Sequence, residues 1–170
     1  MSLLIELRPE FGRALVVGGG LIAARKVRTL LDAGFAVTVV SPERGPELQA
    51  LDGYDWEQRP FAAGDTQPFA LVLACTDDRA VNRAIGEEAR AAGKPVLVAD
   101  AKAESTFFSP AMHRDGGLAI AVSTGGASPS LAREVRDRIA ECLGGGWAET
   151  VAAARHERET RQAEAAWEDA

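Results

Sequence analysis

The chain has 170 residues, of which 46% are hydrophobic and 26% charged, with a formal net charge of −6 and a pI of about 5.0. This length suffices for one sizeable core, or for one domain with a small appendage. The acidic balance argues against nucleic acid and against an anionic membrane surface as partners, and no apolar stretch has the length of a membrane span. The N-terminus does not resemble a signal peptide, and Cys75 and Cys142 form no Cys-x-x-Cys pair. We therefore expect a cytoplasmic protein without a zinc ribbon or a disulfide framework.

The first element in chain order is a strand at Ala14–Val17, which leads through three glycines into a helical pattern over Ile22–Ala33. This order is the one that a dinucleotide pyrophosphate requires. Gly18 permits a tight turn, Gly20 lets the backbone approach the phosphates, and the helix N-terminus supplies free N–H groups. The motif therefore predicts a dinucleotide site. The alternative is a glycine turn in an α/β protein that binds no nucleotide.

Apolar runs and helical patterns continue to alternate up to residue 100. This alternation predicts a Rossmann-type parallel sheet with helices on its faces, in an α/β fold. The other strands of this part are expected at residues 37–40, 54–58, 70–74 and 96–99, with a helix at 80–92 and a short segment at 46–51.

The C-terminal third has a different pattern. Two further strands are expected at residues 106–108 and 118–122, followed by a loop rich in glycine and serine. Pro129 is well placed to begin a helix that ends near Leu143. The glycines at 144–146 suggest a hinge, and residues 147–170 are rich in alanine, glutamate and arginine and are expected to be helical.

The end of the second strand is where an acidic residue usually binds the ribose of the cofactor. Ser41 occupies that place here, and Glu43, two residues later, can reach the ribose hydroxyls. Arg44 can instead accept a 2′-phosphate, which would indicate NADP. A solvated turn is the alternative for both charged residues. We favour NAD as the cofactor.

Ligands of doubly wound sheets bind outside the carboxyl ends of the strands. Thr76 and Asp77 follow the predicted strand 70–74, so both are candidates for lining the nicotinamide side, although this segment also suits a helix cap. Asp100 ends the next strand at the same edge and is a candidate proton acceptor. Capping a turn or pairing with Lys102 is the alternative. Neither histidine lies at metal-site spacing from another ligand, so no metal site is predicted.

The loop between residues 123 and 128 precedes a helix, so its backbone N–H groups can hold an anion. The candidates for substrate binding are Ser123, Thr124, Gly125 and Ser128, together with Arg133 on the helix that follows. A structural turn or a subunit contact is the alternative for the loop, and a solvated helix face is the alternative for the arginine.

Several strings occur together in one order: Gly18-Gly-Gly-x-Ile-Ala-x-Arg-Lys26, Ala74-x-Thr-Asp-Asp78, Val98-Ala-Asp100, and Ser123-Thr-Gly-Gly-x-Ser-Pro129 with Leu131-Ala-Arg133. In this respect the chain resembles the precorrin-2 dehydrogenase / sirohydrochlorin ferrochelatase family over about residues 15–139. The serine- and glycine-rich string is far more specific than the glycine turn alone.

The resemblance implies NAD-dependent oxidation of precorrin-2 to sirohydrochlorin and, in some members, insertion of ferrous iron. It implies a Rossmann domain (1–110), a dimerisation region (111–143) and a helical segment (144–170), which together form a homodimer. Asp100 matches the essential aspartate of the family. Cofactor contacts of the family match Leu21 and Ile22, and also Pro42 and Glu43. Leu97 departs from the pattern, since the family often has asparagine there.

Two other classes of protein remain open. One is a non-catalytic NAD-binding regulatory module, which would not need Asp100 or the serine- and glycine-rich string. The other is a metal chelatase with a vestigial cofactor site.

Overall fold

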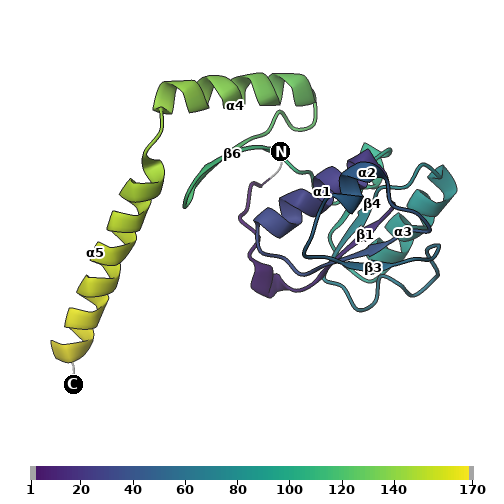
Figure 1. The fold of residues 1–170 in the computed structure, drawn as a ribbon, viewed down its shortest axis with the longest axis horizontal. Helices are drawn as coiled ribbons and strands as arrows, with labels where there is room; N and C mark the ends of the chain where they lie inside the picture. Colours follow the sequence, from purple (N-terminus) through teal and green to yellow (C-terminus); the bar gives the residue numbers. More distant parts are fainter. Residues whose placement is uncertain (1–2, 169–170) are drawn as a thin grey trace. The chain divides into compact units, whose positions relative to one another are not determined.

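The computed structural model describes residues 3–168, with side chains up to residue 164. The chain divides into two compact units, Leu3–Phe108 and the part that begins at Ser109 (Figure 1). The first unit contains η1 (Pro9–Phe11), β1 (Ala14–Val17), α1 (Leu21–Asp32), β2 (Val37–Val40), α2 (Pro46–Gln49), β3 (Asp55–Glu57), β4 (Leu71–Ala74), α3 (Arg79–Ala91), β5 (Val96–Val98) and η2 (Lys102–Glu104). The predicted α/β fold is confirmed.

The five strands of this unit form one parallel sheet in the order β3-β2-β1-β4-β5. Val17 pairs with Val40 on one side and with Ala74 on the other, and Ala74 pairs with Val98. The carboxyl ends of β2, β1, β4 and β5 therefore meet at one edge. The chain order reverses between β1 and β4, and ligands of open α/β sheets bind outside the strands at such a point.

The strands β1, β2, β4 and β5 are buried on both faces of the sheet, which explains why they are mostly apolar, whereas the edge strand β3 is exposed or partly buried. One face of the sheet packs against α1 and α2, through residues such as Val27 and Leu48. The other face packs against α3, through Ile85 and Ala89. A Cβ atom on Gly86 would lie 3.0 Å from Val98 Cγ2, so glycine allows α3 to approach β5 closely.

The second unit begins with an antiparallel hairpin of β6 (Ala111–Asp115) and β7 (Leu118–Val122). The helices α4 (Pro129–Leu143) and α5 (Trp147–Glu168) follow. The Trp147 amide donates to the Asp115 carboxylate at 2.9 Å, which joins the start of α5 to the hairpin. Residues 169 and 170, included in the predicted C-terminal helix, lie outside the described residues.

The prediction of a strand at 106–108 was wrong. Thr106 bonds to Val96 through its amide and its hydroxyl, but residues 106–108 form no ladder. The strand that pairs with β7 is β6, which the sequence analysis missed.

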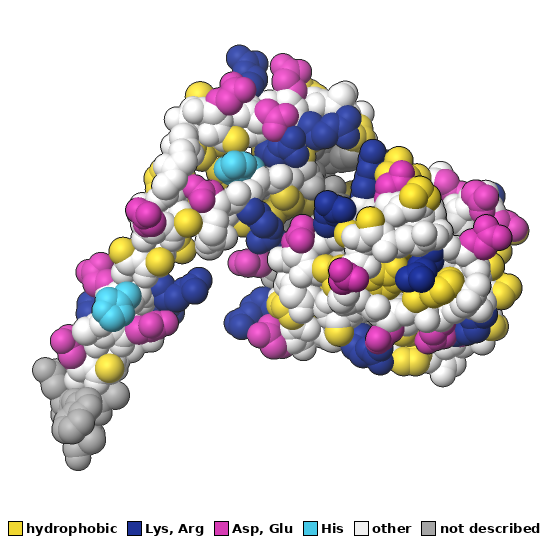
Figure 2. Space-filling view, viewed as in Figure 1, with side chains coloured by type: hydrophobic (Ala, Val, Ile, Leu, Met, Phe, Trp, Pro, Cys, Tyr) yellow, Lys and Arg dark blue, Asp and Glu magenta, His cyan; other side chains and the backbone are white. Residues whose placement is uncertain are grey.

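The helix α5 carries acidic and basic side chains interleaved along its length (Figure 2), and the described side chains of α5 are exposed apart from those of Trp147 and Val151. Across residues 3–168, no helix combines the length and apolar character that crossing a membrane would require.

Candidate functional site

The glycine turn after β1 is packed against two other loops. Gly18 has φ +123°, and a Cβ atom there would lie 2.4 Å from the Cys75 carbonyl oxygen. A Cβ atom on Gly19 would lie 1.9 Å from the Glu43 carbonyl oxygen. Gly20 differs, because a Cβ atom there would meet nothing within 4 Å. The first two glycines are therefore required by the packing of the protein, and the third borders open space.

The N-terminus of α1 faces this open space with unused hydrogen-bond donors. The first bond of the helix runs from the Ala24 amide to the Gly20 carbonyl at 3.0 Å, so the N–H groups before Ala24 have no partner within the helix. The first turn contains no acidic residue. Leu21 and Ile22 are 45% and 52% exposed, so apolar side chains border these donors. Together with the helix dipole, the free N–H groups suit an anion such as a diphosphate.

The loop after β2 is fixed by internal hydrogen bonds. The Ser41 hydroxyl donates to the Glu43 carbonyl at 2.6 Å, and the Trp56 indole N–H donates to the Ser41 carbonyl at 3.1 Å. Ser41 is buried, whereas Pro42 and Glu43 are exposed. The Glu43 carboxylate makes no hydrogen bond or ion pair within the described residues, so it is available to a ligand.

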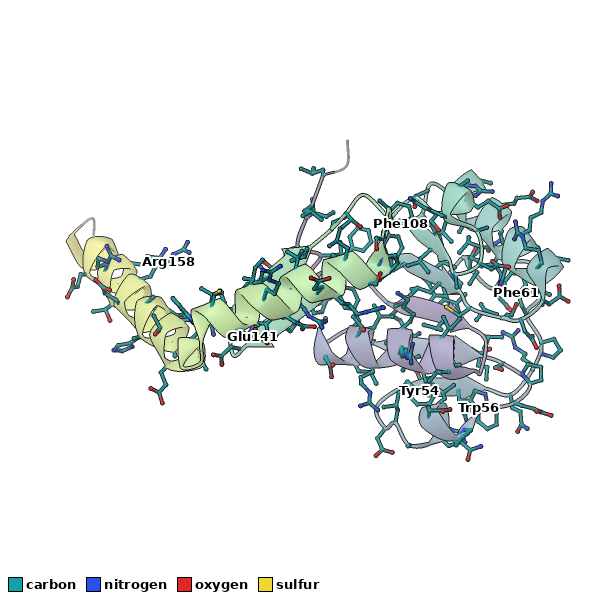
Figure 3. All side chains as sticks on the ribbon, turned by 90° about the horizontal axis from the view of Figure 1, so that it is seen from above. Tyr54, Trp56, Phe61, Phe108, Glu141 and Arg158 are labelled. Carbon is teal, nitrogen blue, oxygen red and sulfur yellow. The ribbon has the colours of Figure 1, made fainter. Side chains whose placement is uncertain are left out.

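Arg44, the candidate for binding a 2′-phosphate, is held against aromatic side chains. Its guanidinium carbon lies 3.8 Å from the ring centre of Trp56, and its Nη1 donates to the Tyr54 hydroxyl at 3.1 Å. Tyr54 and Trp56 lie next to each other beside α2 (Figure 3). A shallow cavity of about 300 Å³ opens here, lined by Glu43, Arg44, Gln49, Trp56 and Gln58.

Three titratable groups influence one another near the end of β4. Cys75 is buried. Burial raises the pKa of its thiol to about 12. The positive charge of Lys26 lowers this pKa, and the negative charge of Asp100 raises it. Burial also lowers the pKa of Lys26 on α1. Cys75 is therefore a protonated, inert thiol at neutral pH, and the charges of Lys26 and Asp100 act on it with opposite signs.

The segment after Cys75 is built around a buried amide. The Asn82 side chain is fully buried; its Oδ1 accepts from the Thr76 amide at 3.0 Å and from the Thr76 hydroxyl at 2.8 Å. Asp78 caps α3 by accepting from the Ala80 and Val81 amides. The side chain of Thr76 is thus engaged within the protein, whereas Asp77 is exposed at the edge of the sheet.

Asp100 lies two residues beyond β5 and its side chain is 37% exposed. Its Oδ1 atom is 3.9 Å from Nη1 of Arg79, the first residue of α3. Because β1 and β5 both pair with β4, only one strand separates the glycine turn from Asp100 at this edge.

The remaining candidates lie in the second unit. The Thr124 hydroxyl accepts from the Ser128 amide at 3.0 Å and donates to the Ser128 carbonyl at 3.1 Å. The Ser128 hydroxyl caps α4 by accepting from the Leu131 amide, and the Ser123 hydroxyl accepts from the Gly125 amide. Arg133 is exposed. The loop is thus stabilised by its own hydroxyls, and its use in substrate binding remains a prediction.

Sequence reasoning missed three residues of the first unit. Gly19 fits against the Glu43 carbonyl, Lys26 lies near Cys75, and Arg79 contacts the acid at Asp100. Gly19 and Lys26 had a signal in the sequence, since both belong to the first string of the family motif, whereas Arg79 had none. Among residues 3–168, no group of three or more His, Cys, Asp or Glu side chains is arranged to hold a metal ion.

Comparisons with known proteins agree on one group of enzymes. Residues 5–111 match a family model described as putative NAD(P)-binding, and residues 115–141 match one described as sirohaem biosynthesis protein central. The siroheme synthase of Methylococcus capsulatus is 45% identical over 132 residues, which cover 76% of this chain and 28% of the relative. That of Ectopseudomonas mendocina is 48% identical over 126 residues, or 74% of this chain and 27% of the relative. The chain therefore spans less than a third of the length of these relatives.

A solved structure is similar over most of its length. The structure of SirC, precorrin-2 dehydrogenase, has a TM-score of 0.71 and 26% sequence identity to this chain. The match covers 88% of this chain and 74% of SirC.

Proposed function

Because this chain belongs to the putative NAD(P)-binding family, we propose that it is an NAD-dependent dehydrogenase that oxidises precorrin-2 to sirohydrochlorin. The resemblance noted in the sequence is confirmed by the matches to siroheme synthases and to SirC. NAD is accordingly the cofactor, and Asp100 is the proposed proton acceptor.

One observation carries the proposal: the glycine turn and Asp100 lie at the same edge of the sheet with only β4 between their strands. Neighbouring strands are about 4.8 Å apart, so the ends of β1 and β5 are about 10 Å apart. A dinucleotide whose diphosphate lies on the turn can extend its nicotinamide toward Asp100 across the end of β4. A hydride acceptor and a proton acceptor can therefore meet one substrate.

The residues present fit the cofactor. Gly20 leaves room in front of the N–H groups of α1, which suits the diphosphate. The free carboxylate of Glu43 suits the ribose hydroxyls, and the cavity beside Arg44 and Trp56 lies next to it. The proposed contacts of the cofactor also include Leu21, Ile22 and Pro42. Its nicotinamide end is proposed to lie beside Thr76 and Asp77.

The chemistry removes one hydride and one proton from the reduced macrocycle. Bound NAD⁺ supplies the hydride acceptor. The Asp100 carboxylate accepts the proton through one of its oxygens. Since Cys75 is held as a thiol, the carboxylate of Asp100 is the acceptor at this point of the edge.

NADH formation from precorrin-2 tests the proposal directly. We expect the wild-type chain to produce NADH and Asp100→Asn to lose at least about 100-fold in turnover, since general-base catalysis contributes about that much or more. Asp52→Asn, an exposed acid in a turn away from this edge, is the matched control and should be unaffected. Full turnover by Asp100→Asn would remove Asp100 from the mechanism.

The same assay separates the alternatives. NAD⁺ binding without NADH formation would indicate a regulatory module. Sirohydrochlorin converted to siroheme only when Fe²⁺ is added, with no NADH from precorrin-2, would indicate a chelatase. Iron insertion is thus a second activity to be measured with sirohydrochlorin and Fe²⁺ in the same preparation.

The second unit supports a homodimer. Among its described side chains, Ala132 alone is buried, so this unit has almost no core of its own. One face of α4 carries an apolar hollow of about 390 Å³, lined by Val135, Arg138, Ile139, Cys142 and Leu143. We propose that a second copy covers this face and that the loop 123–128 with Arg133 binds the anionic tetrapyrrole. Sedimentation of the full chain measures the assembly, and a monomer at micromolar concentration would contradict it.

A further inference from the structure

Arg79 connects two carboxylates at the functional edge. Its Nη2 contacts Oε1 of Glu104, and its Nη1 lies 3.9 Å from Oδ1 of Asp100. The first contact is a direct hydrogen bond, whereas the second is too long for one. The guanidinium is therefore shared unequally, with Glu104 as its main partner.

The helix itself does not explain an arginine at this position. Arg79 is the first residue of α3, where the positive end of the helix dipole disfavours a cation. The Asp78 carboxylate caps this end of α3 and offsets part of this charge. The guanidinium of Arg79 itself pairs with acids that come from the segment after β5.

The backbone of Glu104 is fixed by hydrogen bonds to two other residues. The Arg90 guanidinium donates to the Glu104 carbonyl at 2.6 Å, and the Glu104 amide donates to the Ala101 carbonyl at 3.0 Å. The Oε2 atom of Glu104 is buried and has no hydrogen-bond partner within the described residues; it lies 4.0 Å from the position of a Cβ on Gly86. A carboxylate fixed this way depends on Arg79 for compensation of its charge.

We propose that Glu104 holds the guanidinium of Arg79 away from Asp100, and that this pair sets the pH range in which Asp100 accepts a proton. The inference rests on the proposed function, in which Asp100 is the proton acceptor. A direct ion pair would hold the guanidinium of Arg79 against the Asp100 carboxylate, whereas loss of Arg79 would remove this cation. At 3.9 Å, Arg79 lies near Asp100 without a hydrogen bond to it, and Arg79 and Glu104 are positioning residues.

The other charged and titratable groups around this pair come from several elements. Cys75 faces Asp100 from the end of β4, and Lys26 of α1 lies near Cys75. Arg83 of α3 interacts electrostatically with Glu104 but bonds to Glu87 at 2.8 Å. Lys102, from the same loop as Asp100, lies over the Phe108 ring. Arg79 forms an ion pair with Asp100.

The test is the pH profile of kcat/KM for precorrin-2 oxidation. We expect Arg79→Gln to move the acid limb upward by about one pH unit, because a cation near the carboxylate is lost. We expect Glu104→Gln to move the acid limb downward, because the guanidinium is released to Asp100 and a nearby negative charge is removed. Opposite shifts from the two ends of one ion pair are the signature of the proposal.

Three controls separate this role from a structural one. Arg79→Lys keeps the charge and should stay close to the wild-type profile. Arg83→Gln breaks the Glu87 pair one turn further along the same helix and should leave the acid limb in place. Thermal unfolding of each variant measures the structural cost, which is expected to be similar for Arg79→Gln and Glu104→Gln.

The outcomes separate the inference from the proposed function. If Asp100→Asn is inactive, but Arg79→Gln and Glu104→Gln shift the acid limb in the same direction or not at all, the pair does not tune Asp100 and the inference is wrong. If Asp100→Asn is fully active, the role of Asp100 in the proposed function fails instead.

Discussion

The glycine turn allows folding and cofactor binding to be tested separately, because Gly19 and Gly20 have opposite surroundings. Alanine at Gly19 would place Cβ 1.9 Å from the Glu43 carbonyl oxygen and 2.6 Å from the Ser41 hydroxyl. Neither neighbour can yield easily, since one is backbone and the other is a buried side chain. The substitution must therefore push the loop after β2 away from the turn.

The cost follows from what that movement breaks. The Gly45 amide donates to the Gly19 carbonyl at 2.8 Å, and the Ser41 hydroxyl donates to the Glu43 carbonyl at 2.6 Å. Each bond contributes about 1 kcal/mol, and overpacking adds about 1 to 3 kcal/mol. We expect Gly19→Ala to lower the free energy of unfolding by about 3 to 5 kcal/mol, measured by urea denaturation.

Gly20→Ala should behave in the opposite way. Gly20 has φ −88° and ψ −173°, which alanine adopts freely, and its Cβ would meet open space. The loss of a favoured N-cap residue costs less than about 1 kcal/mol. A methyl group there would keep a diphosphate from the N–H groups of α1, so NAD⁺ affinity should fall about 10- to 100-fold by calorimetry. Wild-type NAD⁺ affinity in Gly20→Ala would refute this placement of the cofactor, and wild-type stability in Gly19→Ala would refute the packing argument.

Two further predictions concern groups away from the turn. Burial tends to raise the pKa of Glu88, but hydrogen bonds from the Thr66 hydroxyl and from the Gly64 and Thr66 amides outweigh it, so the net shift is downward. The Glu88 carboxylate thus stabilises the fold above about pH 4.5, and this contribution is lost as the pH falls through the lowered pKa. Glu88→Gln should lower the free energy of unfolding by about 2 kcal/mol near neutral pH, and should make the free energy measured by urea unfolding depend less on pH in the acid range. For Cys75, alkylation followed by mass spectrometry at mildly alkaline pH should be far slower in the folded protein than in protein unfolded with urea, because its thiol is buried and has a pKa of about 12; equal rates would show that Cys75 is accessible.

The strands β1, β2, β4 and β5 could be predicted from the sequence because they are buried on both faces of the sheet. The strand at 14–17 was predicted with its observed bounds, and the strand at 37–40 likewise. Continuous apolar runs between glycine and proline signals leave few alternatives to a parallel sheet. The predicted helix 80–92 is α3 displaced by one residue, and Asp78 proves to be its cap.

The hairpin of the second unit was harder to predict because β6 contains charged residues and is only partly buried. The sequence does contain a signal for a two-residue hairpin loop, Asp115-Gly116-Gly117. Since β7 follows this loop directly, the loop indicates that its partner strand β6 precedes it. The expected strand at 106–108 has a β-prone sequence but no partner strand. Its Phe107 packs against the core of the first unit.

The contacts that define the site were beyond sequence reasoning because they join distant segments. Gly19 meets Glu43, and Arg79 meets Glu104 twenty-five residues later. Asp100 could be predicted, since its place after a strand fixes the edge of the sheet at which it lies. Its neighbours could not be predicted, because they depend on how α3 and η2 pack against each other.

The hydrogen bonds along this edge of the sheet determine which groups remain available to bind a ligand. The hydroxyls of Ser41 and Thr76 bond to the protein itself, so we infer that these residues serve a ligand by shaping the loops and not through their side chains. Among the described residues at this edge, the N–H groups at the start of α1 and the carboxylates of Glu43 and Asp77 form no hydrogen bond, and Asp100 has its long contact with Arg79. These are donors for a diphosphate, an acceptor for a ribose and a base. Along the edge, Glu43 follows β2, the N–H groups follow β1 and Asp100 follows β5. A dinucleotide has its parts in the same order: a ribose, the diphosphate and the nicotinamide, which would end beside the substrate.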